Sequence, residues 1–356
     1  MPWLCGQPLR ILNPCCGIAP GASSGGEVHE REILRHLPAR GVEPLVFLAP
    51  GKAHPPDVAV LRWPALRHLR WWSAPFLLAP EITWAAKVFP EIRLIRAHSL
   101  RYLGMAAILA GRRTGLPVAV QVHHLDGGPL ARLDRWVIRR ADLVVADSRF
   151  TACQVAEAGA RKVAVVPCGT DLSPAAPRPG DRARFGLGGP VALFLGELKP
   201  RKNVGFLLRV WAEVAARVPS AVLLIAGDGP ERRRLGGLAK RLGVWDRVRF
   251  LGRVPEADKP RLYALADVFL FPSLLEGFGM PVLDAMASGV PALVSDRGAL
   301  PELAKVGGVG VIPLDRPEEW VEETVECLKT PGGYQGAQGM TWDAAAAQMA
   351  AALRIA

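Results

Sequence analysis

Short apolar runs alternate with longer helical patterns along nearly the whole chain, and this alternation limits the fold more than any other feature. Strands that are separated by helices form parallel sheets covered by helices, so the sequence predicts an α/β protein. In the first half the predicted strands are 9–13, 44–49, 92–97, 117–122, 142–147 and 163–167. In the second half they are 191–196, 221–227, 247–252, 267–272, 291–295 and 309–314.

The stretch "SPAAPRPGDRARFGLGGP", residues 173–190, interrupts this rhythm with prolines and glycines. A chain of 356 residues is also too long for one ordinary core. We therefore predict two doubly wound domains, 1–175 and 176–335, that face a central cleft, with a closing helix in 336–356 that returns to the first domain. Ligands of such sheets bind beyond the carboxyl ends of the strands, so we expect the functional residues in the loops there.

Charge and cysteine content narrow the possible partners and the compartment. The formal net charge of +11 favours anionic partners: nucleic acid, acidic lipid head groups or phosphorylated small molecules. The six cysteines form no Cys-x-x-Cys pair and have no histidine at metal-ligand spacing, which predicts reduced thiols in the cytoplasm. The N-terminal stretch lacks a signal-peptide pattern, and no apolar run approaches the ~18 residues of a membrane span. We expect a cytoplasmic protein, or one at the inner membrane surface.

The motif "GELKPRKN", residues 196–203, follows the first strand of the second half. Asn203 is placed to cap the helix that comes next, and Arg201 and Lys202 stand immediately before it. Two cations beside a helix N-terminus suit a diphosphate. Solvated loop charges are the simpler alternative.

The motif "LLEGFGMPVLDAM" follows the fourth strand of that half. Glu276 and Asp284 could accept hydrogen bonds from sugar hydroxyls, one at a hexose and one at a ribose. Gly277 and Gly279 allow a close approach of backbone to a ligand. The alternative is that Glu276 is a turn residue and that Asp284 only favours the helix dipole.

Three motifs in the first half follow predicted strands. The pair Gly25 and Gly26 opens a helix after the first strand, and "HHLDGG" places His123 at the end of another. "AHS" places His98 at the end of the neighbouring strand. Tight packing explains a glycine pair equally well, and a lone histidine is more often a satisfied core residue.

Residues 61–80, "LRWPALRHLRWWSAPFLLAP", interleave tryptophan with arginine. This pattern suits an interfacial membrane patch or a surface that stacks nucleic-acid bases. The alternative is a helix that packs its tryptophans into the first domain and exposes its arginines. We keep peripheral binding to an anionic membrane as a hypothesis.

Together these motifs resemble glycosyltransferase family 4, the retaining nucleotide-sugar enzymes of GT-B architecture with two Rossmann-like domains. The resemblance rests on "GELKPRKN", "LIAGDGPERRRL", "VRFLGRVP", "LYALADVFLFPSLLEGFGMPVLDAMASGVPALVSD", "SSGGEVHEREILRHLPARG", "AVQVHHLDGG", "ADLVVADS" and "VVPCGTD". It covers nearly the whole chain and is more specific in the second half.

The resemblance assigns roles residue by residue. It implies catalytic roles for His123, Glu276, Arg201 and Lys202, with the cationic pair on the sugar-donor diphosphate and His123 near the anomeric carbon. The implied donor-binding residues are Gly25, Gly26, Arg201, Lys202, Glu276, Gly277, Phe278, Gly279, Met280 and Asp284. Asp284 stands where the family usually has Glu, one methylene longer, and Glu197 stands where many members have Arg.

The implied reaction transfers a hexose, with mannose favoured, from a nucleoside diphosphate sugar to a hydroxyl of a glycan, lipid-linked or small-molecule acceptor, with retention. No Asp-x-Asp occurs in the sequence, so we expect neither a metal nor another cofactor. Nucleic acid is not an expected partner. GDP, UDP and ADP donors stay open, as does the acceptor. The alternatives are a nucleotide-sugar 2-epimerase of the same architecture and a catalytically silent GT-B protein that binds polyanions or membrane.

Overall fold

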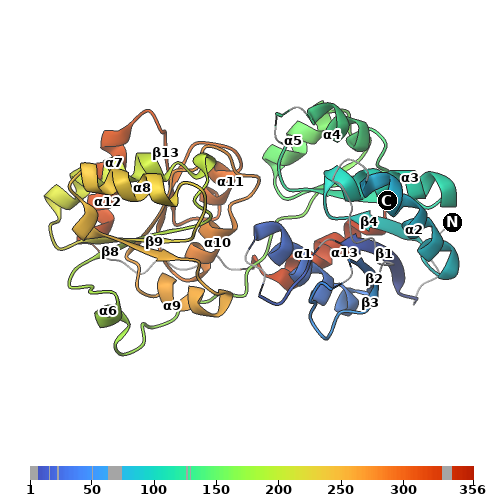
Figure 1. The fold of residues 1–356 in the computed structure, drawn as a ribbon, viewed down its shortest axis with the longest axis horizontal. Helices are drawn as coiled ribbons and strands as arrows, with labels where there is room; N and C mark the ends of the chain where they lie inside the picture. Colours follow the sequence, from blue (N-terminus) through green and yellow to red (C-terminus); the bar gives the residue numbers. More distant parts are fainter. Residues whose placement is uncertain are drawn as a thin grey trace. The chain divides into compact units, whose positions relative to one another are not determined.

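The structure is a computed structural model that describes residues 7–15, 17–21, 24–49, 51–62, 74–125, 127–128, 130–330 and 339–356 (Figure 1). The chain divides into two compact units. Unit 1 comprises Met1–Gly169 and Met340–Ala356, and unit 2 comprises Thr170–Gly339. Each unit has its own parallel sheet with helices, so the prediction of an α/β fold is confirmed.

The described residues of unit 1 form a seven-stranded parallel sheet in the order β3-β2-β1-β4-β5-β6-β7. The strand order turns back between β1 and β4, the place where ligands of doubly wound sheets bind. The strands are β1 Leu9–Cys15, β2 Val42–Leu48, β3 Val60–Arg62, β4 Leu94–Ala97, β5 Val118–Val122, β6 Leu143–Ala146 and β7 Val163–Val165. The helices are α1 Gly25–His36, α2 Ala74–Val88, α3 Met105–Thr114, α4 Ala131–Ile138, α5 Arg149–Glu157 and α13 Trp342–Leu353.

In unit 2 the described residues form a six-stranded parallel sheet in the order β10-β9-β8-β11-β12-β13. Its turning point lies between β8 and β11, which are hydrogen-bonded neighbours. The strands are β8 Val191–Leu195, β9 Val222–Ala226, β10 Val248–Gly252, β11 Val268–Phe271, β12 Ala292–Ser295 and β13 Val309–Ile312. The helices are α6 Asp181–Arg184, α7 Val204–Arg217, α8 Arg232–Arg241, α9 Lys259–Tyr263, α10 Met280–Ala287, α11 Leu300–Ala304 and α12 Pro317–Lys329.

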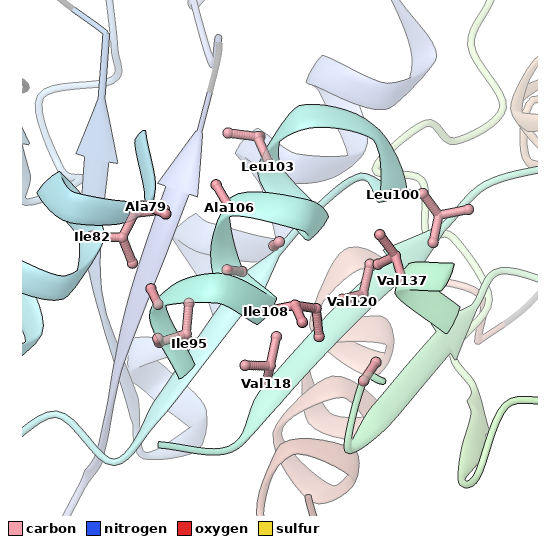
Figure 2. Packing of buried hydrophobic residues seen from close by; sticks show 14 of the residues in the cluster. Ala79, Ile82, Ile95, Leu100, Leu103, Ala106, Ile108, Val118, Val120 and Val137 are labelled. Carbon is pink, nitrogen blue, oxygen red and sulfur yellow. The ribbon is translucent and has the colours of Figure 1, made fainter. Parts of the chain in front are cut away.

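The main apolar core of unit 1 lies between the sheet and helices α2, α3 and α4. In Figure 2, Ile95 and Val120 of the sheet point toward Ala106 and Ile108 of α3, and all four are almost inaccessible to solvent. Strands buried on both faces read as unbroken apolar runs, which is why the sequence predicted them. This core fixes the carboxyl ends of β4 and β5, where the polar residues of the site begin.

Helix α13 belongs to unit 1 although unit 2 precedes it in the chain. It packs beside α1, and Figure 1 shows the two helices, red and blue, next to each other. Trp342 at its start is 4 % exposed, and Thr341 caps the helix by accepting a hydrogen bond from the Ala344 amide at 3.2 Å. The alanine-rich sequence gives it good helix propensity and a small cross-section.

Two further findings concern membrane contact. Among the described residues, no helix is both long enough and apolar enough to cross a bilayer. Of the Trp-Arg segment 61–80, residues 63–73, which include Trp63, Arg67, Arg70, Trp71 and Trp72, lie outside the described residues. The segment's last part begins helix α2, described below.

Candidate active site

One carboxylate oxygen organises the site in unit 2. Glu276 lies in the loop after β11, and Arg201 and Lys202 lie in the short helix η3 (Pro200–Lys202) after the neighbouring strand β8. Glu276 Oε1 accepts hydrogen bonds from Arg201 Nη1 at 3.0 Å, Lys202 Nζ at 2.6 Å and Ser273 Oγ at 2.6 Å. The ends of two adjacent parallel strands thus bring together the three residues that the sequence singled out.

The two cations of this site differ in their access to solvent. Lys202 and Glu276 are 6 % and 7 % exposed, whereas the Arg201 side chain is 36 % exposed. Burial alone would raise the pKa of Glu276, but the charges of Lys202 and Arg201 hold it below its ordinary value. With Glu276 ionised, two positive charges meet one negative charge. The excess of one positive charge, with Arg201 reaching solvent, favours an anionic ligand.

Backbone and hydroxyl contacts fix the two loops to each other. Leu274 donates its amide to the Arg201 carbonyl at 2.7 Å, and Ser273 Oγ is 3.0 Å from the same oxygen. Ser295, at the end of β12, donates its hydroxyl to the Ser273 carbonyl. Nothing in the sequence pointed to Ser273. Its only signal is a hydroxyl three residues before Glu276 in a loop, which is too common to stand out.

Asn203 differs from its expected capping role. It does occupy the N-cap position of α7, but its backbone has the left-handed φ of 54°, and its side chain makes no capping hydrogen bond. A capping side chain requires an extended N-cap residue. Asn203 instead turns the chain from η3 into α7, a conformation that Asn tolerates better than most residues.

Close backbone packing explains two glycines near Glu276. Gly279 precedes α10 with φ 102°, and a Cβ there would lie 2.7 Å from Leu300 Cδ2. At Gly298 a Cβ would lie 2.4 Å from the Glu276 carbonyl oxygen. Phe278 is 8 % exposed and Met280 begins α10. Gly277, Phe278 and Gly279 therefore form a turn of fixed shape beside the carboxylate.

Asp284, the second predicted carboxylate, lies further along α10. Its Oδ1 accepts a hydrogen bond from Thr170 Oγ1 at 2.7 Å. Burial raises its pKa to about 6, opposed by the Lys259 charge and reinforced by that of Glu256. Asp284 thus belongs to a different set of contacts from the Glu276 cluster.

In unit 1, His123 and Gly26 lie together at the sheet edge. His123 follows β5, and its Nδ1 lies 2.6 Å from Asp147 Oδ2 at the end of the neighbouring strand β6. A Cβ on Gly26 would lie 3.8 Å from His123 Nε2. Gly25 and Gly26 form the first turn of α1, whose N-cap Ser24 accepts the Glu27 amide. Asp147 was not among the predicted site residues, although "ADS" lies at the end of a predicted strand.

Charge pairing raises the pKa of one histidine at this site, and burial lowers the pKa of two others. Burial alone would lower the pKa of His123, but the Asp147 carboxylate raises it above its ordinary value. His29 of α1 packs edge-to-face on the His123 ring, with centroids 5.0 Å apart. Burial lowers the pKa of His29 to about 3, so His29 is neutral. Burial also lowers the pKa of His98, at the end of β4.

A buried ion pair holds α1 against the strand ends. Arg96 of β4 donates to Glu30 of α1, with Nη1 to Oε2 at 2.7 Å, and to Asn13 Oδ1 of β1 at 2.9 Å. Asn13 in turn donates to Glu30 Oε1 at 2.7 Å. Burial alone would raise the pKa of Glu30, but Arg96 lowers it to about 2.

The described residues also offer two buried groups whose ligand atoms lie within 4.8 Å of one another, as in metal sites. They are Cys15, Glu30 and His98, and His29, Asp147 and Cys168. In each group the carboxylate already has other partners: Glu30 pairs with Arg96, and Asp147 accepts from His123 and Gln121. We therefore assign no metal to either group.

A pocket of about 170 Å³ opens beside His123 in unit 1. Arg101 and Asp134 line it and form a bidentate pair, with nitrogen–oxygen distances of 3.1 and 2.9 Å. The neighbouring Tyr102 has φ 57° and ψ −67°, a strained γ-turn geometry. Strain of this kind concentrates at functional sites.

Two family descriptions match the two halves of the chain. "Glycosyltransferase Family 4" matches residues 23–174 and "Glycosyl transferases group 1" matches residues 181–332. Each match covers most of one unit.

Two relatives show what the chain is similar to. A GDP-mannose-dependent alpha-(1-6)-phosphatidylinositol monomannoside mannosyltransferase of Mycolicibacterium smegmatis is 35 % identical over 263 residues, 66 % of this chain and 68 % of that protein. A D-inositol 3-phosphate glycosyltransferase of Nocardia farcinica is 31 % identical over 264 residues, 69 % of this chain but only 54 % of that protein.

Solved structures show the same fold at lower identity. The sucrose-phosphate synthase of Thermosynechococcus elongatus gives a TM-score of 0.80 at 21 % identity, covering 98 % of each chain. Anabaena HepE, solved with UDP-glucose, gives 0.76 at 22 % identity, covering 98 % of this chain and all of that one.

Proposed function

This chain belongs to glycosyltransferase family 4 and has the GT-B fold, and we propose that it transfers a hexose from a nucleoside diphosphate sugar to an acceptor hydroxyl with retention at the anomeric carbon. The single observation that carries the proposal is the Glu276 cluster. One carboxylate oxygen holds Arg201 and Lys202 in place.

This cluster suits the hardest part of such a reaction, which is the charge that develops on the leaving diphosphate. Arg201 and Lys202 would offset that charge, and their salt bridges to Glu276 fix their positions relative to each other. Preorganised cations stabilise a transition state without reorganising during the reaction. With two cations in this role, we propose that no metal ion is needed.

In the proposed reaction the acceptor hydroxyl attacks the anomeric carbon of the sugar from the same face from which the diphosphate leaves. Glu276 is proposed to contact the transferred sugar, and Gly277, Phe278, Gly279 and Met280 to present backbone to the donor. His123 is proposed to orient or stabilise the sugar rather than to act as a nucleophile. Gly25 and Gly26 are proposed to leave room near the phosphates, and Asp284 to contact the ribose.

We propose GDP-mannose as the first donor to test. The support is the name of the M. smegmatis relative, a GDP-mannose-dependent mannosyltransferase. The named relatives also suggest an acceptor class: one is named for a phosphatidylinositol mannoside and the other for an inositol phosphate. Acceptors that carry a phosphorylated inositol should therefore be tried before simple mannosides and polysaccharides.

The test measures thermal unfolding and turnover with GDP-mannose, UDP-glucose and ADP-glucose. A donor at a hundred times its Kd adds about 2.7 kcal/mol to the free energy of unfolding, which gives a clear shift. The double variant Arg201→Ala/Lys202→Ala should lose that shift and turnover. Arg217→Ala is the matched control, because it removes an exposed cation paired with Glu322 at the other end of α7.

The assay separates the alternatives. Release of nucleotide only when an acceptor is present supports transfer, whereas release without an acceptor supports a 2-epimerase. The anomeric proton of the product reports retention, and unchanged turnover in EDTA supports a metal-independent reaction. A well-folded protein that neither binds nor turns over any nucleotide sugar would overturn the proposal in favour of a catalytically silent protein.

We further propose that the protein binds an anionic membrane surface peripherally through α2. Phe76, Leu77, Trp84 and Val88 are 59 %, 42 %, 49 % and 49 % exposed. Phe76, Trp84 and Val88 recur at multiples of four residues, so they share one face of the helix. The opposite side, with Leu78 and Ile82, is buried in the core of unit 1.

A further inference from the structure

We infer that Asp147 is a positioning residue for His123, which it holds with the ring proton on Nδ1 and the Nε2 lone pair directed at the substrate. The inference rests on the proposed function, in which His123 acts on the transferred sugar. Asp147 contacts His123 and is only 2 % exposed, so it can influence a substrate only through the histidine.

The hydrogen bond between Asp147 and His123 determines which ring nitrogen carries the proton. Asp147 Oδ2 lies 2.6 Å from His123 Nδ1. An ionised carboxylate only accepts hydrogen bonds, so Nδ1 must carry the proton. Burial alone would raise the pKa of Asp147, but the charge that His123 carries when protonated and the hydrogen bonds from His123 and Gln121 hold it below its ordinary value, so the carboxylate is ionised at neutral pH. In the neutral ring, Nε2 is then an acceptor.

A second hydrogen bond holds the Asp147 carboxylate in place. Its other oxygen, Oδ1, accepts a hydrogen bond from Gln121 Nε2 on β5, two residues before His123. Because β5 and β6 are paired strands, the carboxylate is clamped between a strand residue and the ring that it orients. A histidine held in this way cannot turn over without breaking a buried charged hydrogen bond.

The other ring nitrogen of His123, Nε2, is left for a ligand. His123 Nε2 has no hydrogen-bond partner among the described residues. A Cβ built on Gly26 would lie 3.8 Å from this nitrogen, so the absence of a side chain at Gly26 leaves space beside it. A buried polar atom without a partner is costly unless a ligand or water completes it. Nε2 is therefore available to a hydroxyl group.

The neighbouring His29 does not take over the carboxylate. Its Nε2 lies 4.0 Å from Asp147 Oδ1, too far for a hydrogen bond, and its ring is neutral. The titratable and charged groups near His123 are Asp147 just after β6, His29 and Glu30 on α1, Arg96 on β4 and His98 just after it. Arg101, His124 and Asp134 line the pocket beside the ring. Of these, Asp147 makes the direct hydrogen bond.

The first test reads the ring proton without any substrate. Nitrogen-15 NMR of the histidine-labelled full chain, at a pH above the pKa of His123, distinguishes protonated from unprotonated ring nitrogens. We expect Nδ1–H and a bare Nε2. A ring with its proton on Nε2 would overturn the inference whatever the enzyme transfers, so this failure is distinct from failure of the proposed function.

The second test is Asp147→Ala, compared with wild type in kcat, in the KM for GDP-mannose and in the pH profile. At metal-bound histidines, loss of the partner that orients the ring typically costs about 10- to 100-fold in activity, and we take this range for His123. We expect a kcat loss of that size with KM changed less than about twofold, because Arg201, Lys202 and Glu276 are intact. The pKa of His123 should fall, since the ring loses the Asp147 charge and hydrogen bond that oppose the effect of burial, and the acid limb of the profile should move to lower pH.

Asp142→Asn is the matched control. Asp142 lies immediately before β6, at the other end of the strand from Asp147, and its Oδ2 accepts the Val118 amide at 2.8 Å, which an Asn oxygen can replace. It should keep the wild-type kcat, pH profile and tautomer. If Asp147→Ala folds and retains wild-type kcat and His123 pKa, the inference is wrong. If that variant does not fold, the wild-type NMR result decides.

Discussion

Three hydrogen bonds converge on Glu276 Oε1, so Arg201 and Lys202 share this single atom as their counter-charge. Glu276→Gln would leave a buried lysine without its counter-charge. Breaking a buried pair by removing one partner costs about 3 to 5 kcal/mol, and the exposure of Arg201 places the expected loss near the lower limit. Urea unfolding of the variant should show this loss, whereas Glu322→Gln, which removes an exposed partner of Arg217, should cost less than about 1 kcal/mol.

The same carboxylate predicts an acid-sensitive fold. Its pKa is lowered in the folded protein, so its contribution to stability is present above the ordinary value of 4.5 and is lost as pH falls through the lower folded value. Glu276→Gln should remove this part of the pH dependence. An unchanged acid transition in the variant would contradict the assignment.

Asp284 predicts the opposite pH dependence. Its pKa rises from 3.8 to about 6 on folding, so its ionisation destabilises the fold progressively between those values and fully above them. Asp284→Asn keeps an oxygen for Thr170 Oγ1 and should add about 1 to 3 kcal/mol at pH 7.5 and much less near pH 4. Thermal unfolding at both pH values measures this difference. Equal gains at both would contradict it.

The sequence best predicted which residues lie close together where the strand order of the sheet determines their positions. Arg201, Lys202 and Glu276 follow β8 and β11, and once these are adjacent parallel strands their loops must meet. Ser273 and Asp147 were missed because a lone serine or aspartate in a loop has no characteristic spacing. The side-chain partner of Asp284, Thr170, was equally invisible, because it depends on how the start of unit 2 lies against α10.

Helix α2 is unusual because its exposed face, like its buried face, carries apolar side chains. If its exposed face binds membrane, Phe76→Ser/Trp84→Ser should reduce flotation with anionic liposomes at low salt by at least about fivefold. Trp245→Ser, at an exposed tryptophan of unit 2, is the control and should not change flotation. Absence of wild-type binding at low salt would remove the idea.

The strands were the most predictable elements, because buried parallel strands leave apolar runs that turn residues end. All twelve predicted strands appear in the structure, with ends shifted by at most two residues. β3, Val60–Arg62, was missed. It has three residues at the edge of the sheet, none fully buried, and such a strand has no apolar run to detect.

At the scale of the whole molecule, unit 1 is built from two separate stretches of chain. Its second stretch supplies Trp342, whose ring packs edge-to-face on His29 at 5.8 Å, and Asp343, which pairs with Arg40. Trp342→Ala should destabilise unit 1 by about 3 to 5 kcal/mol and leave unit 2 unaffected. Calorimetry should show one transition moving down while the nucleotide-sensitive transition keeps its Tm. A common shift of both transitions would contradict independent units.

This arrangement has a consequence for biosynthesis. The ribosome completes all of Thr170–Gly339 before it makes α13, so unit 2 can reach its native state while unit 1 still lacks a helix. Until α13 emerges, the flank of α1 that it covers stays bare, and nascent chains with exposed apolar surface are clients for chaperones. The domain that is begun first is thus the one that is finished last.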